Sequence, residues 1–595
     1  MKKTPDSGPN LARHALFDGV SDAAVKSLES ASTLKPIIGG ERLVAQGDDA
    51  DALYFVESGR FRVVVNKAHI VAHIEAGEAL GELAFFAGGK RTADVIATRD
   101  SVVLKISRNA FDTIAKTHPE LTQAMLKLVS ERLVVATSRA GAVSSNTPRV
   151  IALIPAGNGQ LPDGLLSRLS AAFEAVLPSD IPVVAVDQAT NETADGAAYQ
   201  SWLAEQEAKG AYVLIDGSGT SQWGEQVCRN ADALVMVGRP GQADPQPNAM
   251  EQKAMQWIAP LQRTLLLIRD KASTVISKSA QWIDPRAPQL HHHMALDDAA
   301  DFNKVARFLT GRAIGLVLAG GGALGCAHLG VVAALRDAEI PIDFIGGASA
   351  GAAMGGAIAR GMTVEETLDQ MEAMFIQAKA MRRLTLPLYS LLDPTVFDSE
   401  LRTRYGTKDI ADQPINFFGV STNLSTNGLH VHRRGPLWEA VRASGSLPTI
   451  LPPFIDRDSN ILVDGGVLDN VPVKVMHGLK TGPNIVVSLG DPDEIWRTDV
   501  DYDDIRGRWT LMKDVILRRK REAEFPSIVE IMSRSMVVAS RMASKEMLGE
   551  DDILVNPPII PDMQILDWHL GRELADMASE YMRHQVIESA GLKDL

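Results

Sequence analysis

The sequence contains only two cysteines, Cys228 and Cys326, among 595 residues. Two cysteines exclude a disulfide framework and a cysteine-based zinc site, and they fit a reducing compartment. Basic residues are also in the minority, because 60 Lys and Arg stand against 74 Asp and Glu, giving a formal net charge of −14. Non-specific nucleic-acid binding needs a basic face, so this balance argues against nucleic acid as a partner.

Long uninterrupted apolar runs are scarce. The first ten residues are polar and lack the apolar core of a signal peptide. The most apolar long stretch, Ala313 to Leu335, contains a cluster of glycines, each of which costs a helix about 1 kcal/mol. We therefore expect a strand, a loop and a helix there, no transmembrane segment, and a cytoplasmic protein.

The pattern of short and long apolar runs predicts a multidomain α/β chain. At about 150 residues per domain, the length suggests about four domains. Short strand-like runs spaced by Gly and Asp predict an all-β roll, whereas buried-type runs alternating with amphipathic segments predict a mostly parallel sheet. The segments we expect are a β-roll with helices at 1–137, a linker at 138–148, an α/β middle region at 149–311 and a C-terminal α/β domain at 312–595, with its core at about 313–480 followed by a helical part.

Two features of the middle region carry no evident chemistry. Residues 280–299 are linker-like in composition. They include the triplet His291-His292-His293, which has no carboxylate partner at a spacing typical of metal ligands. We expect a histidine cluster at the surface or between domains, and no metal site.

An apolar strand-length run, Ala313 to Leu318, opens into a glycine-rich turn and then a helical run. Glycines let the backbone turn sharply and direct several N–H groups at one point beside a helix N-terminus. Such a point stabilises a phosphate or the oxyanion of a tetrahedral intermediate. The residues of this turn are Gly320, Gly321, Gly322, Ala323, Leu324 and Gly325.

The same turn fits the dinucleotide-binding pattern G-x-G-x-x-G. A dinucleotide fold places an acidic residue at the end of the next strand. The next strand is expected at Asp343 to Gly346, and its acidic residue stands at the start. The sequence therefore argues against a dinucleotide site.

That next strand ends in Gly347-Ala348-Ser349-Ala350-Gly351, which fits the nucleophile elbow G-x-S-x-G. Only small residues two positions either side leave room for a serine on such a tight turn. A histidine usually serves as the base, but none of the five that follow Ser349 has a telling context. Asp464 instead ends an apolar strand and precedes two glycines. Alone, an Asp-Gly pair is typically a turn former.

Taken together, GGGALG, GASAG and DGG resemble the patatin-like phospholipases, over about Ala313 to Ala590. The resemblance extends to the stretches at 421–428 and 442–454 and, with the N-terminal module, to the neuropathy-target-esterase branch. It implies a serine hydrolase with no cofactor, in which Ser349 is the nucleophile and Asp464 the general base. The N–H groups of Gly320, Gly321, Gly322, Ala323 and Gly325 would form the oxyanion hole. Family members commonly carry Arg or Lys where this chain has Leu324, which could lower activity or alter substrate preference.

The resemblance implies covalent acyl transfer from phospholipid or lysophospholipid esters. A bare carboxylate is a weak base for serine, so burial must raise its pKa or hold the pair tightly. For contact with lipid, the apolar stretch Leu447–Phe454 could be an acyl-chain wall or an interfacial lip, and it reads equally well as a buried crossover loop. The basic cluster at 517–521 could meet anionic headgroups on the inner face of the membrane or simply be a solvated helix face.

The N-terminal stretch, about Leu16 to Leu133, resembles a cyclic-nucleotide-binding domain. Its most specific residues are Gly81 and Glu82, followed by Arg91 and Thr92. The resemblance implies that Glu82 holds the ribose, that Arg91 holds the cyclic phosphate, and that cAMP or cGMP is a regulatory ligand. The alternative is a degenerate β-roll kept for structure or for assembly of a homo-oligomer.

Three functions remain open from the sequence. The first is a phospholipase or lysophospholipase regulated by cyclic nucleotide. The second is a nucleotide sensor whose hydrolase domain is silent, and the third is a short-chain esterase.

Overall fold

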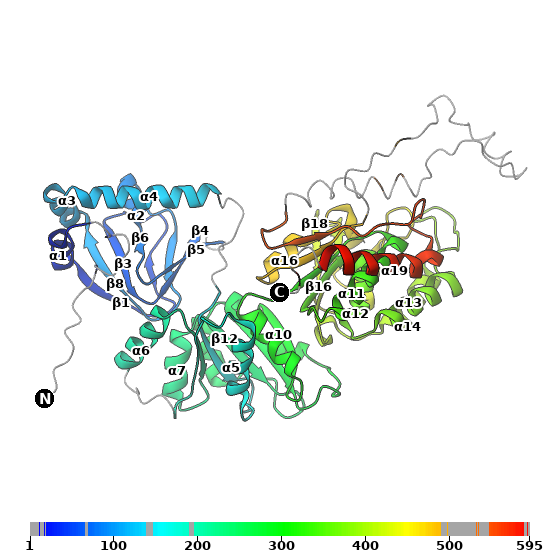
Figure 1. Cartoon of the computed structure of the whole chain (residues 1–595), viewed down its shortest axis with the longest axis horizontal. Helices are drawn as coiled ribbons and strands as arrows, with labels where there is room; N and C mark the ends of the chain where they lie inside the picture. Colours follow the sequence, from blue (N-terminus) through cyan, green and yellow to red (C-terminus); the bar gives the residue numbers. More distant parts are fainter. Residues whose placement is uncertain are drawn as a thin grey trace, which may run out of the picture. The chain divides into compact units, whose positions relative to one another are not determined.

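A computed structural model describes residues 20–65, 69–138, 147–189, 196–489 and 547–587, together with Leu11, Phe17, Arg497, Ile531, Arg534 and Leu592. The chain forms two compact units (Figure 1). The first unit comprises residues 1–274 and 280–310, and the second comprises 275–279 and 311–595. Within the described residues, no helix is both long enough and apolar enough to cross a bilayer.

The N-terminal part of the first unit is a β-roll of two antiparallel sheets, with strand orders β1-β8-β3-β6 and β2-β7-β4-β5. Alternate side chains of β3 point to opposite faces of its sheet. Leu53 and Phe55 pack against helices, whereas Tyr54 and Val56 face the other sheet. The strands are β1 (Thr33–Ile37), β2 (Arg42–Val44), β3 (Ala52–Ser58), β4 (Arg60–Val65), β5 (His69–Glu75), β6 (Ala79–Leu80), β7 (Asp94–Ala97) and β8 (Ser101–Ser107). The helices are α1 (Asp22–Ala31), α2 (Glu82–Ala87), α3 (Arg108–Thr117) and α4 (Glu120–Ser138).

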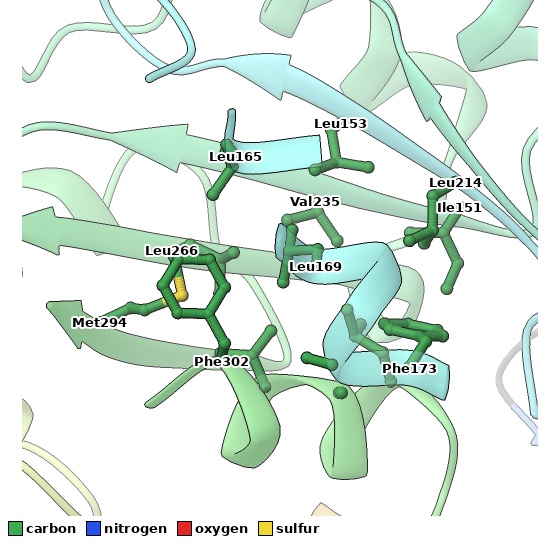
Figure 2. Close-up of a cluster of buried hydrophobic side chains, with 14 of the residues drawn as sticks. Ile151, Leu153, Leu165, Leu169, Phe173, Leu214, Val235, Leu266, Met294 and Phe302 are labelled. Carbon is green, nitrogen blue, oxygen red and sulfur yellow. The ribbon is translucent and has the colours of Figure 1, made fainter. Parts of the chain in front are cut away.

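The rest of the first unit is a parallel six-stranded sheet ordered β10-β11-β9-β12-β13-β14. Apolar side chains of α5 and α10 cover one face and form a continuous core with residues of five strands, β9 and β11 to β14 (Figure 2). The strands are β9 (Val150–Pro155), β10 (Val183–Val186), β11 (Tyr212–Asp216), β12 (Ala233–Gly238), β13 (Arg263–Arg269) and β14 (Leu290–Ala295). The helices are α5 (Leu165–Val176), α6 (Gly196–Ala208), α7 (Ser221–Asn230), α8 (Ala249–Trp257), α9 (Ala280–Ile283) and α10 (Ala299–Leu309).

The prediction of a linker at 280–299 is wrong, because this segment contains α9 and the edge strand β14. The histidine triplet lies within β14, where His292 and His293 are buried rather than at the surface. The His292 ring packs on Phe308, with ring centroids 4.1 Å apart. Packing against α10 therefore buries β14, although the polar composition of this segment does not predict a buried strand.

Buried charges connect the β-roll to the parallel sheet within the first unit. Asp232, 2% exposed, pairs with Arg60 at 3.2 Å and with Arg99 at 3.6 Å. Arg99 also pairs with Glu207 on α6. Burial alone would raise the pKa of Asp232, but the two arginines and the N–H groups from which it accepts outweigh burial and lower that pKa. This cluster is therefore a charged contact between two differently built halves.

The second unit is an eight-stranded sheet ordered β19-β20-β17-β16-β15-β21-β22, with β18 paired to β17. Its central strands are parallel, and β18, β19 and β20 run antiparallel to their neighbours. The strands are β15 (Gly315–Leu318), β16 (Phe344–Ala348), β17 (Asn416–Asn423), β18 (Gly428–His432), β19 (Phe454–Ile455), β20 (Ile461–Asp464), β21 (Asn484–Val487) and β22 (Ile553–Val555). The β-roll, the α/β middle region and this mostly parallel sheet confirm the predicted fold class.

The helices of the second unit pack closely on this sheet. Helix α19 lies beside α11 although the two are far apart in the sequence (Figure 1). Gly330 permits this contact, since a Cβ there would lie 2.0 Å from the Ala575 carbonyl oxygen. The helices are α11 (Cys326–Asp337), α12 (Ala350–Ala359), α13 (Val364–Glu372), α14 (Thr395–Tyr405), α15 (Leu437–Ser444), α16 (Val473–Leu479) and α19 (Gly571–Tyr581).

Candidate active site

Ser349 lies on a sharp turn between β16 and α12. Its backbone has φ 52° and ψ −117°, a conformation that is unfavourable for a residue with a side chain. The Ser349 N–H donates to Ser444 Oγ at 2.8 Å, and the Ser444 hydroxyl donates to the Val420 carbonyl at 2.6 Å. These bonds hold the strained turn, which is the strand–turn–helix context that G-x-S-x-G predicts.

Glycine is required on both sides of Ser349, because a side chain at either flanking position would collide with backbone atoms. A Cβ on Gly347 would lie 2.6 Å from the carbonyl carbon of Gly351. A Cβ on Gly351 would lie 2.2 Å from the Leu318 carbonyl oxygen on β15. Both distances are far inside van der Waals contact, so neither position accepts a side chain without backbone movement.

Asp464 ends β20, directly opposite Ser421 of β17, and is 1% exposed. Its N–H donates to the Ser446 carbonyl at 2.9 Å, and its Oδ1 accepts from the Gly466 N–H at 2.8 Å. A Cβ on Gly465 would lie 2.4 Å from the Val420 carbonyl oxygen. The two glycines after the aspartate thus let its turn fold tightly against β17 and fix the carboxylate.

Burial raises the pKa of Asp464 to about 6, while hydrogen bonds from the Ser349 side chain and the Gly466 N–H work against that rise. The structure therefore brings together the two residues predicted to react. Asp464 Oδ2 is buried and has no partner with full hydrogen-bond geometry among the described residues. This oxygen is available for a proton, and a carboxyl group with a pKa near 6 is a stronger base than an exposed aspartate yet largely ionised at neutral pH.

The glycine turn after β15 lies against the serine. A Cβ on Gly320 would lie 2.9 Å from Ser349 Cβ and 2.5 Å from Asn470 Oδ1. Gly322 has φ +58°, and a Cβ there would lie 2.3 Å from the Ile565 carbonyl oxygen. The turn continues as a short 3-10 helix (Gly322–Gly325) into α11. The arrangement thus brings a serine, a buried carboxyl group and a glycine turn to one place.

Not every N–H group of this turn is free to stabilise an oxyanion. The Ala323 N–H donates to the Ile565 carbonyl at 2.8 Å, and the Gly320 N–H donates to the Asn470 carbonyl at 3.3 Å. Our expectation for these two donors does not fit the structure. The N–H groups of Gly321 and Gly322 donate to no backbone carbonyl in the described parts of the chain. Gly325 allows close packing instead, since its Cβ would lie 2.8 Å from Ala350 Cβ.

Two side chains that the sequence did not single out hold this turn. Asn470 Nδ2 donates to the Gly320 carbonyl at 3.3 Å, and Asn470 follows the turn that carries Asp464, so it links the two loops. His328 on α11 is fully buried, with Nε2 2.8 Å from the Ala319 carbonyl oxygen. Burial lowers the pKa of His328 to about 4, partly offset by that bond, so the ring is neutral and donates through Nε2.

A third missed residue is Arg442, which is 2% exposed on α15. Its guanidinium pairs with Asp398 and donates to Ser446 Oγ at 2.6 Å and to the Pro452 carbonyl at 3.2 Å. These bonds fix the turn that contains both Ser444 and Ser446. Arg442 therefore acts indirectly, by positioning the partners of Ser349 and Asp464.

Two histidines downstream of the serine are bonded to other side chains. His432 Nε2 lies 2.7 Å from Ser421 Oγ, and burial lowers the pKa of His432 to about 3. His477 Nε2 lies 2.8 Å from Asp552 Oδ2.

The apolar stretch Leu447–Phe454 is partly buried, and its central pair of apolar side chains lies in the core. Ile450 and Leu451 are buried, whereas Thr449 and Pro453 are exposed. The structure thus favours the buried crossover over the interfacial lip. The basic cluster at 517–521 lies outside the described residues.

Three of the four residues predicted to hold a cyclic nucleotide, Gly81, Glu82 and Arg91, lie together at the start of α2. The side chain of the fourth, Thr92, is exposed. Arg91, 4% exposed, donates through Nη1 to the Gly81 carbonyl at 2.9 Å and through Nη2 to the Ala52 carbonyl. Glu82 is also buried, at 2% exposed. Gly81 has φ +81°, and a Cβ there would lie 2.2 Å from Arg91 Nη1, so the glycine is required for this contact.

The loop after β9 is closed from within the domain. The Gly157 N–H donates to Glu251 Oε2 at 2.8 Å, and Glu251 forms a fully buried ion pair with Arg286. A Cβ on Gly157 would lie 1.9 Å from the Asp244 carbonyl oxygen. The N–H group at the start of this loop thus already donates to a carboxylate of the same chain.

Comparison with known families covers all three parts of the chain. Residues 316–477 match the patatin-like phospholipase family, and residues 37–118 match the cyclic nucleotide-binding domain. Residues 165–310 match the neuropathy target esterase family P-loop like domain.

Several relatives match this chain over most of its length. Mouse patatin-like phospholipase domain-containing protein 7 is 28% identical over 98% of this chain, and Drosophila melanogaster neuropathy target esterase sws is 28% identical over 87%. This chain spans only 47% and 40% of those two proteins. An uncharacterized NTE family protein of Mycobacterium bovis is 30% identical over 82% of this chain and 81% of its own length. With a patatin-like domain, the P-loop like domain and a cyclic nucleotide-binding domain in one chain, this protein belongs to the neuropathy target esterase (NTE) family.

Proposed function

We propose that this protein hydrolyses acyl esters of phospholipids and lysophospholipids, with Ser349 as nucleophile and Asp464 as general base. The observation that carries the proposal is the buried carboxyl of Asp464, whose pKa is raised to about 6 beside the Ser349 hydroxyl. The strained elbow of Ser349 supports the same chemistry, as do the N–H groups of Gly321 and Gly322, which donate to no backbone carbonyl within the described residues.

The reaction would proceed in two displacements. Asp464 accepts the Ser349 proton as Oγ attacks the ester carbonyl, and the N–H groups of Gly321 and Gly322 stabilise the oxyanion. The carbon–oxygen bond to the alcohol then breaks, and the alcohol leaves with the proton from Asp464. Water attacks the acyl-serine and gives a proton to Asp464. The bond between the acyl carbon and Oγ then breaks, Asp464 returns the proton to Oγ, and the fatty acid is released with Ser349 regenerated.

The direct test is release of fatty acid from lysophosphatidylcholine by the full chain, beside Ser349→Ala and Asp464→Asn. We expect each substitution to lower the rate by about 10³-fold or more, because nucleophile and base act as one unit. Activity retained by either variant would contradict the assignment of the pair. Release from short-chain esters but from no lysolipid would leave the dyad in place and favour an esterase.

We also propose that the β-roll binds a cyclic nucleotide through Arg91 and Glu82. The observation in favour is that both side chains are buried together at the turn of Gly81. Because two carbonyls already hold the Arg91 guanidinium, an anion must compete with them, and affinity is therefore modest. Calorimetry with cAMP and cGMP tests this, with Glu82→Gln as the matched variant. Absence of binding at sub-millimolar nucleotide would leave the β-roll a structural module.

A further inference from the structure

One loop of the catalytic unit displays apolar side chains to solvent. Between α13 and α14, four large side chains within six residues are about as exposed as side chains in an extended chain: Leu384 81%, Leu386 79%, Leu388 78% and Tyr389 83%. Single exposed apolar residues are ordinary on protein surfaces, but a contiguous group marks a site of interaction. We call residues 384–389 the apolar tip.

The apolar tip is held by an ordered base. The Thr385 N–H donates to the Leu391 carbonyl at 3.1 Å, and the Asp393 N–H donates to the Arg383 carbonyl at 2.8 Å, so the loop closes as a hairpin. Leu392 and Ser390 at the base are buried, and the Ser390 hydroxyl donates to the Leu392 carbonyl at 2.8 Å. The exposed leucines are therefore presented by a fixed scaffold.

The base of the hairpin is built on the segment that supports the dyad. The Leu391 and Leu392 N–H groups donate to the carbonyls of Thr449 and Ile450, at 2.7 and 3.0 Å. These carbonyls follow closely after Ser446, whose own carbonyl accepts from the Asp464 N–H. A surface that engages the apolar tip is thus connected to the candidate active site through one short, hydrogen-bonded stretch of chain.

The charged residues that immediately precede the apolar tip in the sequence are all basic. Lys379, Arg382 and Arg383 are exposed just before it, and no Asp or Glu occurs between Glu372 and Asp393. The whole chain, in contrast, carries a formal net charge of −14. Leucines bordered by cations and a tyrosine match the layers of an anionic bilayer surface, where Tyr favours the headgroup level and Lys and Arg attract anionic lipids.

Resting on the proposed function, we infer that residues 379–389 dock the catalytic unit on an anionic phospholipid surface, with the apolar tip inserted among the lipids. This assigns membrane contact to a loop other than the Leu447–Phe454 stretch, which instead supports it. A second copy of the chain is the competing occupant, and it would appear as self-association rather than as vesicle binding.

The test is co-sedimentation of the full chain with phosphatidylcholine vesicles, with and without phosphatidylglycerol. We expect Leu386→Ser with Leu388→Ser to lower vesicle partitioning by about tenfold or more for each leucine removed. Arg382→Glu with Arg383→Glu should remove the preference for phosphatidylglycerol. Leu261→Ser is the matched control, because Leu261 is 60% exposed in the other unit and should leave partitioning unchanged.

Hydrolysis of a soluble short-chain ester separates this inference from the proposed function. We expect the leucine variant to cleave the soluble ester at the wild-type rate while losing release of fatty acid from vesicles. If neither the wild type nor any variant hydrolyses an ester, but vesicle partitioning still falls in the leucine variant, the proposed function fails and the docking surface stands. Unchanged partitioning in the leucine variant overturns the docking surface. A wild-type dimer that the leucine variant converts to monomer, without a change in partitioning, would assign the apolar tip to self-association.

Discussion

Replacing Asp464 by asparagine should abolish activity and stabilise the catalytic unit at the same time. The introduced amide could still accept from the Gly466 N–H, but it has no charge to be buried and takes no proton from Ser349. The pKa of Asp464 is raised from 3.8 to about 6 by burial. A rise of about 2 units corresponds to about 3 kcal/mol of destabilisation by the ionised carboxylate.

The sign of this effect sets its dependence on pH. Between about pH 4 and 6 the folded protein holds a proton on Asp464 that the unfolded chain has lost, so stability falls as the pH rises through this window. Below the window both states are protonated, and the destabilisation disappears. The free energy of unfolding of Asp464→Asn should therefore exceed that of the wild type by about 3 kcal/mol at pH 8, with no gain in stability below pH 4.

Hydrogen exchange of peptides from β16 and β20, measured at both pH values, follows the stability of this part of the chain. Ser349→Ala is the matched control, because it also removes activity but leaves the buried carboxylate in place and should not stabilise the protein. The reasoning would be refuted if Asp464→Asn were less stable than wild type at pH 8. A gain that persisted unchanged below pH 4 would refute it equally.

Three further substitutions test the packing around the site and in the first unit. Gly351→Ala should destabilise the catalytic unit by about 2 kcal/mol or more, measured by thermal unfolding, because its Cβ would meet a backbone carbonyl at 2.2 Å; Gly478→Ala, with open space around it, is the control and should be neutral or slightly stabilising. Asp232→Ala should cost about 3–5 kcal/mol and increase exchange in both halves of the first unit, because it leaves two buried arginines without this partner; equal exchange in wild type and variant would contradict the contact. Because burial lowers the pKa of His328 to about 4, protonation destabilises the folded protein as the pH falls from about 6.5 to 4. His328→Gln should therefore lose less stability than the wild type over that range. Urea unfolding at each pH measures the difference.

The sequence predicted the parts of the site that depend on neighbouring residues. The elbow around Ser349 follows from spacing and from the need for small flanking residues, and the contacts of Gly347 and Gly351 supply the physical reason. Asp464 was assigned through the family resemblance, because an Asp-Gly pair alone is an ordinary turn. Its burial at 1% exposure comes from strands that are distant in the sequence.

The missed residues act over long sequence separations. Ser444 and Asn470 bond to residues 95 and 150 positions away, and no local pattern marks such contacts. The apolar tip was missed for a different reason, since Leu384 and its neighbours have the composition of ordinary core residues until the structure shows them exposed. Strand β14 was missed because its histidines suggested a polar surface.

The most direct test of the Ser349–Asp464 pair is covalent labelling by a fluorophosphonate, which forms a stable bond to an activated serine. The account predicts one adduct, located on Ser349 by peptide mass spectrometry, with a labelling rate that falls as the pH drops through about 6 and is lost in Asp464→Asn. Labelling at another serine, or labelling of Ser349 that is unaffected by Asp464→Asn, would contradict the dyad.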